Sequence, residues 1–321
     1  MLVLGINMCV RLFRYGRLFR THILGCPTVV CMNPEVNRRM LLQGEAGGLV
    51  PGYPQSMLDI LGRNNMAAVH GPLHRVMRGA MLGLVRPTAL RQSLLPKMDA
   101  FMRHHLAGTV VDVQAKTKEM ALLSALGQIA GITAGPLSDA LQTELYTLVL
   151  GIISLPINLP GTSYYQGFHH PPEEAISYED FKSMAFTRAV IFETLRLATV
   201  VNGLLRKTTQ DVEMNGYVIQ KGWRIYVYTR EINYDPFMYP DPMTFNPWRW
   251  LKKNMESHPH FMLFGGGGRM CPGKEVGTAE IATFLHYFVT RYRWEEEGKN
   301  TILKFPRVEA PNGLHIRVQD Y

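Results

Sequence analysis

The residue types with the clearest chemical potential lie around Cys271. An apolar run at 261–264 leads into four consecutive glycines, and Arg269, Cys271 and Pro272 follow. Glycine allows backbone turns closed to other residues and lets a flat ligand approach closely. Pro272 suits the first turn of a helix, and a helix N-terminus favours the thiolate form of Cys271. A thiolate beside such a loop suits the axial position of a heme iron, and Arg269 is placed to pair with a heme propionate.

Two other interpretations of this stretch stay open. A lone cysteine is more often a small buried apolar side chain than a ligand. Residues 268–274 also satisfy the G-x-x-x-x-G-K pattern of a phosphate-binding loop. Glu275, however, occupies the position where that loop needs a serine or threonine for magnesium, and its charge would repel phosphate. The nucleotide interpretation is therefore weak.

Composition restricts the class of protein. The 321 residues can bury a large core, and 46% apolar with 19% charged residues indicates a globular chain. A formal charge of +8 favours acidic partners or anionic membrane surfaces, while no motif supports binding to nucleic acid. The four cysteines show neither a C-x-x-C pair nor zinc-ligand spacing, so no disulfide framework is expected. The apolar run at 2–10 is shorter than the roughly 20 residues of a membrane span, so no anchor is expected there.

The elements that must position these residues are mainly helical. Apolar residues recur at three- and four-residue intervals, and strand-like alternation is confined to short segments. The sequence therefore predicts a mainly α fold with small β-sheets. Helices are predicted at 33–42, 70–86, 94–107, 113–131, 137–153, 178–197 and 276–292. Strands are predicted at 15–19 and 28–30, and at 215–219 and 223–229 with a connecting turn at 221–222.

The cysteine segment resembles the heme-binding signature of the cytochrome P450 family. The pattern F-x-x-G-x-R-x-C-x-G is matched by Phe264, Gly267, Arg269, Cys271 and Gly273. The resemblance implies the P450 fold and a heme-thiolate monooxygenase with heme b as cofactor. It also implies that Cys271 is the proximal iron ligand, that Phe264 lies near the thiolate face, and that Gly265 and Gly273 belong to the cofactor-binding loop. NADPH would supply electrons through a flavoprotein reductase.

Two arginine elements upstream extend the resemblance. Residues 192–196 contain E-x-x-R as Glu193 and Arg196, and residues 245–249 resemble the family's F-x-P-x-R element, which ends at Arg249. An E-x-x-R pair alone is common on solvated helices and contributes little there. The order of the two elements before the cysteine loop nevertheless matches the family. The resemblance implies that Glu193, Arg196 and Arg249 form a buried charge network.

A set of propionate-binding side chains is also implied. The family's W-x-x-x-R helix is represented by His74 and Arg78, which lie four residues apart on one helical face. Both side chains can donate to a carboxylate, although a solvated basic face is the alternative. Arg206, just before the predicted sheet, and Arg269 complete the set of expected propionate ligands.

Longer segments resemble one group within the family, the plant brassinosteroid C-6 oxidases. The similar segments are 54–61, 186–193, 284–294 and 306–313. The resemblance implies oxidation at C-6 of a 6-deoxo brassinosteroid, such as 6-deoxocastasterone to castasterone, in plant hormone synthesis. The implied partners are a steroid substrate and NADPH–cytochrome P450 reductase. The implied location is the cytosolic face of the endoplasmic reticulum membrane.

Two departures from the family pattern give a shortened chain. We expect the N-terminal anchor with its Pro-rich hinge to be absent, and also the central helix with the A/G-G-x-D/E-T-T/S motif that activates oxygen. Residues 134–136 cannot replace that motif, because Pro136 would break the helix. The gap falls between Phe168 and His170, where the composition also changes.

We therefore expect one shortened P450 domain, with N-terminal strands and helices at 1–168 and a heme-binding core at 169–321. No distal catalytic residue is identified. The leading hypothesis is a monooxygenase or a shortened isoform of one. The alternatives are a non-catalytic isoform that binds heme or sterol without oxygen activation, and a nucleotide-binding protein built on 268–274.

Overall fold

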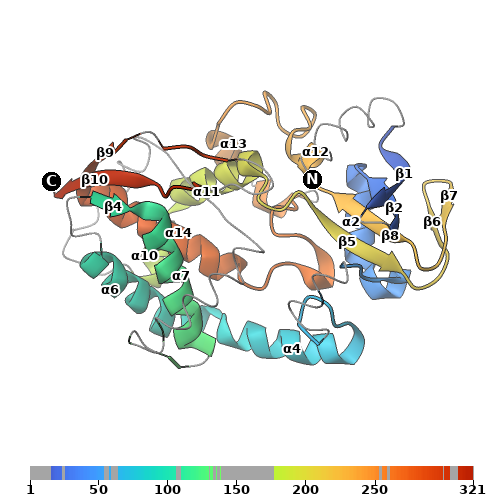
Figure 1. The fold of residues 1–321 in the computed structure, drawn as a ribbon, viewed down its shortest axis with the longest axis horizontal. Helices are drawn as coiled ribbons and strands as arrows, with labels where there is room; N and C mark the ends of the chain where they lie inside the picture. The colour runs from blue at the N-terminus through green and yellow to red at the C-terminus, as the bar shows by residue number, and fades with distance from the viewer. Residues whose placement is uncertain are drawn as a thin grey trace. The chain divides into compact units, whose positions relative to one another are not determined.

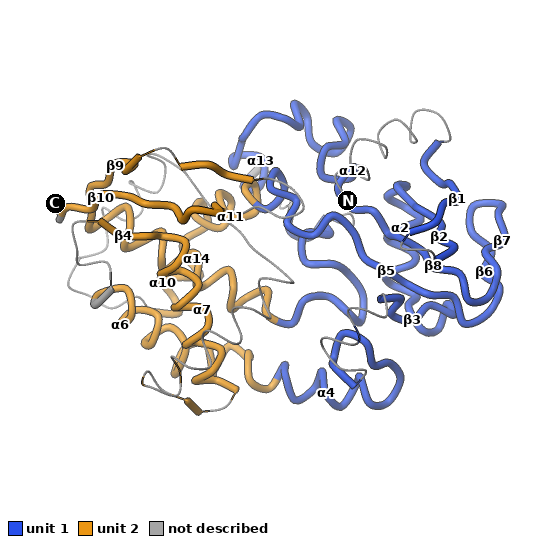
Figure 2. The backbone as a smooth tube through the Cα atoms, viewed as in Figure 1, with its two compact units in different colours: residues 1–82, 195–272 blue, residues 83–194, 273–321 orange. Residues whose placement is uncertain are grey.

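The computed structural model describes residues 16–23, 26–53, 58, 64–105, 110–129, 131–132, 135, 138, 177–252, 255–258, 261–298, 300–303 and 310–320. The chain forms two compact units, each built from two segments that are distant in sequence (Figure 2). Unit 1 comprises 1–82 with 195–272, and unit 2 comprises 83–194 with 273–321. The predicted division at 168 and 169 lies outside the described residues, as does most of the predicted helix at 137–153. Both stay predictions.

Unit 1 is organised by a five-stranded sheet that joins the N-terminal segment to the segment after residue 195. Its order is β1-β2-β8-β5-β3, and β2 and β8 run parallel whereas the other neighbours are antiparallel (Figure 1). The strands are β1 (Leu18–Ile23), β2 (Cys26–Cys31), β3 (Leu49–Pro51), β5 (Gly203–Thr208) and β8 (Arg224–Tyr228). The predicted N-terminal strand pair is therefore confirmed, but the first strand begins at Leu18 and ends at Ile23, later than the predicted 15–19, and the second is longer than the predicted 28–30.

The helix α2 (Pro34–Gln43) packs on this sheet. Asn33 caps it by accepting a hydrogen bond from the Val36 N–H, and Pro34 occupies the first turn, as the sequence predicts. Met40 and Leu41 of α2 are buried in one cluster with sheet residues such as Val29, Ile225 and Val227. The remaining elements of unit 1 are η1 (Gly44–Gly47), α4 (Gly71–Leu84, whose last two residues belong to unit 2), α12 (Arg230–Asn233), α13 (Trp248–Lys252), η3 (Met255–Ser257) and η4 (Gly267–Arg269).

One predicted strand pairing is wrong. Strand β7 (Tyr217–Ile219) pairs with β6 (Val212–Met214) and not with β8, which lies between β2 and β5. Asn215 and Gly216 form the tight turn of the β6–β7 hairpin, with φ of 53° and 80°. An Asn-Gly pair is the preferred two-residue hairpin turn because both positions need positive φ. This turn signal outweighs the turn expected at 221–222.

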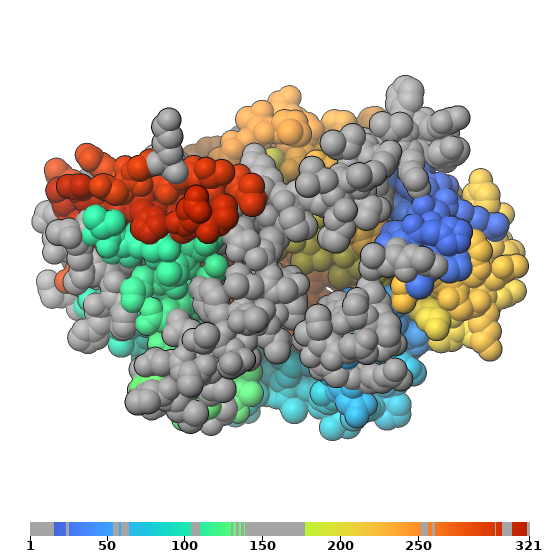
Figure 3. Space-filling view, in the orientation of Figure 1, coloured from blue at the N-terminus to red at the C-terminus, as the bar shows by residue number. Residues whose placement is uncertain are grey.

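Unit 2 contains helices and a three-stranded antiparallel sheet of order β4-β10-β9. Its elements are α5 (Pro87–Ala89), η2 (Leu90–Leu94), α6 (Leu95–His105), β4 (Val110–Asp112), α7 (Val113–Ile129), α10 (Tyr178–Ser183), α11 (Ala185–Ala198, which ends in unit 1), α14 (Lys274–Thr290), β9 (Tyr292–Glu296) and β10 (His315–Asp320). The C-terminal residues lie directly beside β4 and the start of α7 on the face drawn in Figure 3. The helix predicted at 178–197 is divided in two at Met184.

Helices α6 and α14 of unit 2 are joined by a polar contact inside an apolar interface. The Tyr287 hydroxyl donates to the Asp99 carboxylate, and the Arg103 Nε donates to the same carboxylate at 2.9 Å. Tyr287 is 2% exposed, and Asp99 is buried as well. Buried polar groups need such partners, because an unsatisfied one costs about 1–3 kcal/mol. This contact fixes the register of the two helices.

The predicted charge network centres on α11. Glu193 and Arg196 are both fully buried and lie three residues apart on this helix. The Arg196 Nη1 donates to the carbonyls of Asn233 and Pro242, both at 2.7 Å, and its guanidinium lies over the Tyr239 ring. Arg196 therefore organises the segment that follows β8.

Arg249 acts on the same segment from its other end. Its guanidinium donates to the carbonyl oxygens of Pro240 at 2.8 Å, Thr244 at 3.3 Å and Asp241 at 3.5 Å. Asp241 has φ of 50°, so the turn that Arg249 binds is held in an uncommon conformation. Direct pairing of Glu193 with the two arginines stays a prediction.

Replacing Arg196 with methionine should destabilise the fold strongly. Arg196→Met leaves two carbonyls without a charged donor, and such hydrogen bonds contribute about 1.5–3 kcal/mol each. Chemical denaturation should therefore give a free energy of unfolding lower by at least the contribution of one such bond, about 1.5–3 kcal/mol. The exposed Arg39 of α2 supplies the control, since Arg39→Met should change stability by less than about 0.5 kcal/mol. Equal stabilities of the two variants would contradict this role.

Candidate heme site

The cysteine loop is closed by three backbone hydrogen bonds within unit 1. The N–H groups of Gly265, Met270 and Cys271 donate to the carbonyls of Met262, Gly267 and Phe264, at 3.0, 3.1 and 2.8 Å. The last of these bonds joins Phe264, just before the glycine run, to Cys271 itself. The loop is thereby a closed ring that presents Cys271 from a fixed backbone.

Glycine is required at two points of this loop. Gly265 and Gly267 have φ of 78° and 63°, a region in which a side chain is strained. A Cβ on Gly267 would lie 2.0 Å from the Leu41 carbonyl oxygen, which is far inside contact distance. The loop therefore lies directly against the backbone at the end of α2.

Cys271 differs from the other cysteines of the described residues. Its side chain is exposed, whereas Cys31 is buried and burial raises the pKa of that thiol to about 11. The interpretation of Cys271 as a small buried apolar residue is therefore wrong. Pro272 is also placed differently from the prediction, because α14 begins at Lys274 with Gly273 as its N-cap. Pro272 precedes this cap and is not in the first turn.

The phosphate-loop interpretation finds no support in the local structure. Glu275 stands in the first turn of α14. Its carboxylate accepts a hydrogen bond from Lys182 at 3.2 Å and lies 3.6 Å from Arg188. Lys182 and Arg188 are thus turned to an acid of the chain itself, and Lys274, the lysine of the motif, lies over the Phe192 ring.

Arg269 is held in place by the segment before α4. Its Nη2 donates to the carbonyl oxygen of Val69 at 2.6 Å and to the carboxylate of Glu45 at 3.3 Å. Its Nη1 donates to the carbonyl oxygen of Ala67 at 3.5 Å. A guanidinium has five N–H donors. The three contacts above use three of them, so two have no acceptor among the described residues and remain for a ligand.

Arg206 is a buried cation in β5, 4% exposed. Its Nη1 donates to the Leu205 carbonyl at 3.1 Å. Burial lowers the pKa of Arg206, Tyr53 opposes this effect, and the neighbouring charge of Arg269 lowers it further. No acidic residue among those that the structure describes raises the pKa of Arg206. Within these residues, Arg206 is therefore a buried cation that lacks a counter-charge.

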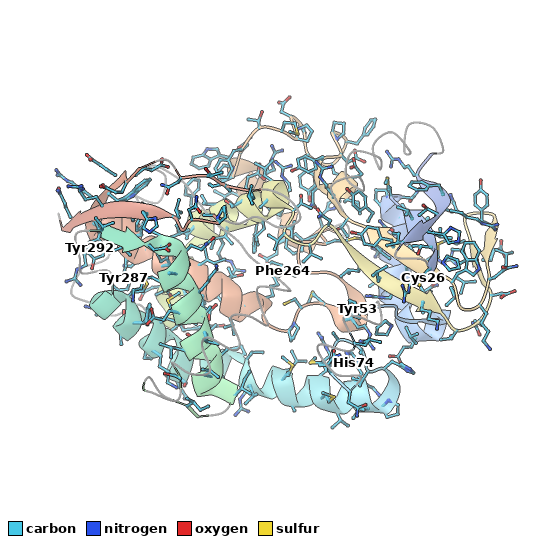
Figure 4. The ribbon with its side chains drawn as sticks, in the orientation of Figure 1. Cys26, Tyr53, His74, Phe264, Tyr287 and Tyr292 are labelled. Carbon is cyan, nitrogen blue, oxygen red and sulfur yellow. The ribbon has the colours of Figure 1, made fainter. Side chains whose placement is uncertain are left out.

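His74 belongs to the same neighbourhood. It projects from α4, and Figure 4 labels it together with Tyr53 and Phe264 of unit 1. Burial is the main cause that lowers the pKa of His74, and the charges of Arg269 and Arg78 lower it further, whereas Glu45 raises it. His74 is therefore a neutral imidazole at pH 7 that can donate one hydrogen bond.

Arg269 and His74 connect the four predicted propionate ligands electrostatically. Arg206 and His74 both respond to Arg269, and His74 also responds to Arg78. Glu45 is the carboxylate placed beside them, where it accepts a hydrogen bond from Arg269 and its charge acts on His74. A flat cofactor with two carboxylates fits this excess of donors, and the exposed Cys271 lies two residues from Arg269. The residues present are therefore suited to heme.

Glu45 is the member of this cluster that sequence reasoning missed. The stretch 44–54 has the Gly and Pro content of a surface connection, so it carries no chemical signal of its own. Its contacts with Gly71 and Arg269 bridge 26 and 224 positions of sequence. Only the folded chain reveals such a pairing.

Comparisons with known proteins agree with this site. The Cytochrome P450 family profile matches residues 169–314. Cytochrome P450 85A1 of Brachypodium distachyon is 67% identical over 409 aligned positions, which cover 98% of this chain and 88% of that protein. Cytochrome P450 85A1 of Oryza sativa subsp. japonica is 64% identical with the same coverage, and Cytochrome P450 85A2 of Arabidopsis thaliana is 46% identical over 96% of this chain and 86% of that protein.

Solved structures agree on the fold. The retinoic acid-bound cyanobacterial CYP120A1 has a TM-score of 0.78 at 22% identity, with 99% of this chain and 95% of that one covered. A zebrafish cytochrome P450 with abiraterone has a TM-score of 0.76 at 17% identity, with coverages of 98% and 99%.

The fold and the cysteine site define a heme-thiolate protein, and this chain belongs to the cytochrome P450 family. It is a monooxygenase by family, with heme as its cofactor and with electrons that come from NADPH through a redox partner. The predicted P450 fold of mainly helices with small sheets is confirmed. Within the described residues, no helix combines the length and the apolar character that crossing a membrane requires.

The titration of His74 tests the site. In the heme-free protein its pKa should lie below the ordinary 6.5, because burial and two cations oppose protonation. The folded pKa is depressed, so the stability that neutral His74 contributes is complete above about pH 6.5 and is lost as the pH falls toward the folded pKa. Titration of the imidazole signal by NMR measures this value.

Heme loading should then raise the pKa of His74, because two carboxylates would join a cluster that is otherwise cationic. A His74 pKa that stays constant or falls on loading would place the propionates elsewhere.

Proposed function

We propose that this chain binds heme through Cys271 and descends from the C-6 oxidases of 6-deoxo brassinosteroids. The observation that carries the heme site is the exposed cysteine of a closed glycine loop, two residues from an arginine that belongs to a cationic cluster. Heme, when bound, supplies oxygen activation at an iron made electron-rich by its thiolate ligand. The chain's own residues hold the cofactor: Cys271 as ligand, and Arg78, Arg206, Arg269 and His74 as donors to propionates.

The substrate class rests on the similar relatives and on the segments that resemble brassinosteroid C-6 oxidases. Relatives in the 85A group share 46–67% identity with this chain. We infer that the substrate is a 6-deoxo steroid such as 6-deoxocastasterone and that NADPH–cytochrome P450 reductase is the electron donor. We also infer a location at the cytosolic face of the endoplasmic reticulum membrane, to which the charge of +8 is suited through anionic lipids.

A second proposal concerns the length of the chain. The alignment with the Brachypodium distachyon relative spans 409 positions, whereas this chain has 321 residues, so at least 88 positions have no counterpart here. This gap supports the proposal that the chain is a shortened form without the central helix. The position inferred for it, between Phe168 and His170, lies outside the described residues.

The residues missing from such a form would handle protons on the substrate side of the heme. Positioned acids and bases contribute about 10² to 10⁴ in rate. Without the central helix, no side chain of this chain is assigned to that role, and water would reach the cofactor. The non-catalytic alternative, which binds heme or sterol without turnover, follows from this reasoning.

Ligation by Cys271 is tested by absorbance of the reduced, carbon monoxide-bound protein. Cys271→Ser should lose the thiolate-type band, because Cys271 is the exposed thiol next to the glycine loop. Cys26→Ser is the matched control and should keep the band. An unchanged band in Cys271→Ser would show that another residue ligates the iron.

Turnover distinguishes the enzyme from the non-catalytic form. The 321-residue chain, loaded with heme and supplied with reductase and NADPH, should convert little or no 6-deoxocastasterone. Insertion of the family's central segment between Phe168 and His169 should restore the conversion. Product analysis by mass spectrometry measures both proteins side by side. Equal turnover by the two would refute the role assigned to the missing segment.

A further inference from the structure

Glu45 of η1 caps the helix that carries two of the propionate donors. Both of its carboxylate oxygens accept the Gly71 N–H, at 3.0 and 2.9 Å. Gly71 is the first residue of α4 and has φ of 65°. Helix N-termini carry N–H groups without intrahelical partners and a partial positive charge, so a carboxylate is favourable there. Glu45 therefore determines where α4 starts.

The same carboxylate contacts the cysteine loop. Its Oε1 lies 3.3 Å from the Nη2 of Arg269, and the hydrogen bond from Gly71, followed by Arg269 and His70, lowers the pKa of Glu45. Glu45 is thus ionised at neutral pH. It is in contact with the loop that presents Cys271 and with the helix that presents His74.

The helical spacing extends this contact to the other donors. Gly71, His74 and Arg78 follow one another at three and four residues, so they lie on one face of α4. A shift of the helix start moves His74 and Arg78 together. Arg269 responds to the same carboxylate, so one residue sets the positions of three predicted propionate donors.

Stability alone does not account for Glu45. The carboxylate is 37% exposed, and ion pairs of this exposure contribute little to folding. Its two contacts instead join segments that are separated by 198 positions, at Gly71 and Arg269. Joining distant segments at a binding site aligns the donors before the cofactor arrives, which reduces the cost of ordering them.

We propose that Glu45 is a positioning residue of the heme pocket, which aligns α4 with the cysteine loop so that His74, Arg78 and Arg269 meet the propionates. This inference rests on the proposed heme site. Residues that orient the groups holding a metal cofactor commonly change its affinity about 10- to 100-fold when mutated. Glu45 reaches the cofactor only through the groups that it orients.

The test compares Glu45→Ala and Glu45→Gln with Glu297→Gln in the full chain. Glu297 is a matched control because it is also a half-exposed carboxylate paired with an arginine, Arg317, at 3.0 Å. The first readout is amide hydrogen exchange, which should be about fivefold faster at 71–78 in Glu45→Ala, the effect of a lost helix cap. Glu45→Gln keeps one carbonyl acceptor and should be intermediate.

The second readout is the rate of heme transfer from the loaded protein to excess apomyoglobin. We expect about tenfold faster heme loss in Glu45→Ala, a smaller increase in Glu45→Gln, and no change in Glu297→Gln. Heme loss at the parental rate in Glu45→Ala would overturn the positioning role, and so would unchanged exchange at 71–78. The exchange readout needs no heme, and Cys271→Ser tests the ligand separately, so failure of the heme site is distinguishable from failure of this inference.

Discussion

The close approach of the cysteine loop to α2 is the constraint on which the site depends. Gly267 lies so near the Leu41 carbonyl that any side chain would collide with it. Leu41 in turn belongs to the buried cluster of α2 and the five-stranded sheet. The loop therefore lies against the buried core of unit 1. An exposed thiol can keep a defined position only on such a rigid support, because exposure removes the packing that would otherwise hold it.

The cationic cluster beside the loop has an electrostatic cost at Arg206, which no acid among the residues described by the structure offsets. Burial opposes the charge on Arg206, and Arg269 repels it. Such a cluster is stabilised when an anion binds, since the attraction of opposite charges is stronger away from bulk water. Perturbed titration concentrated in one place is typical of a binding site. Burial first, and then the same cationic charges, lower the pKa of His74, which favours the neutral imidazole.

The segment between β8 and the cysteine loop is held by hydrogen bonds from arginine side chains. Arg196 and Arg249 donate to five backbone carbonyls between Asn233 and Thr244 and thereby replace regular secondary structure with side-chain hydrogen bonds. Backbone carbonyls need partners when a segment lacks a ladder or a helix. The two arginines thus hold an irregular segment that leads the chain toward the heme loop.

The sequence by itself determined the family and most of the helices, and it carries the prediction of Cys271 as the iron ligand, because each depends on local spacing. The cysteine signature spans ten residues, and Asn33 with Pro34 marks a helix start within two. The sequence also contains the Asn215-Gly216 turn signal, which the prediction of a β7–β8 pair overlooked. Only the tertiary structure decided that Cys271 is exposed, that Arg206 is buried next to Arg269, and that Glu45 joins α4 to the cysteine loop. The contacts of Glu45 join residues 26 and 224 positions apart, and no local pattern encodes which distant side chains a fold brings together.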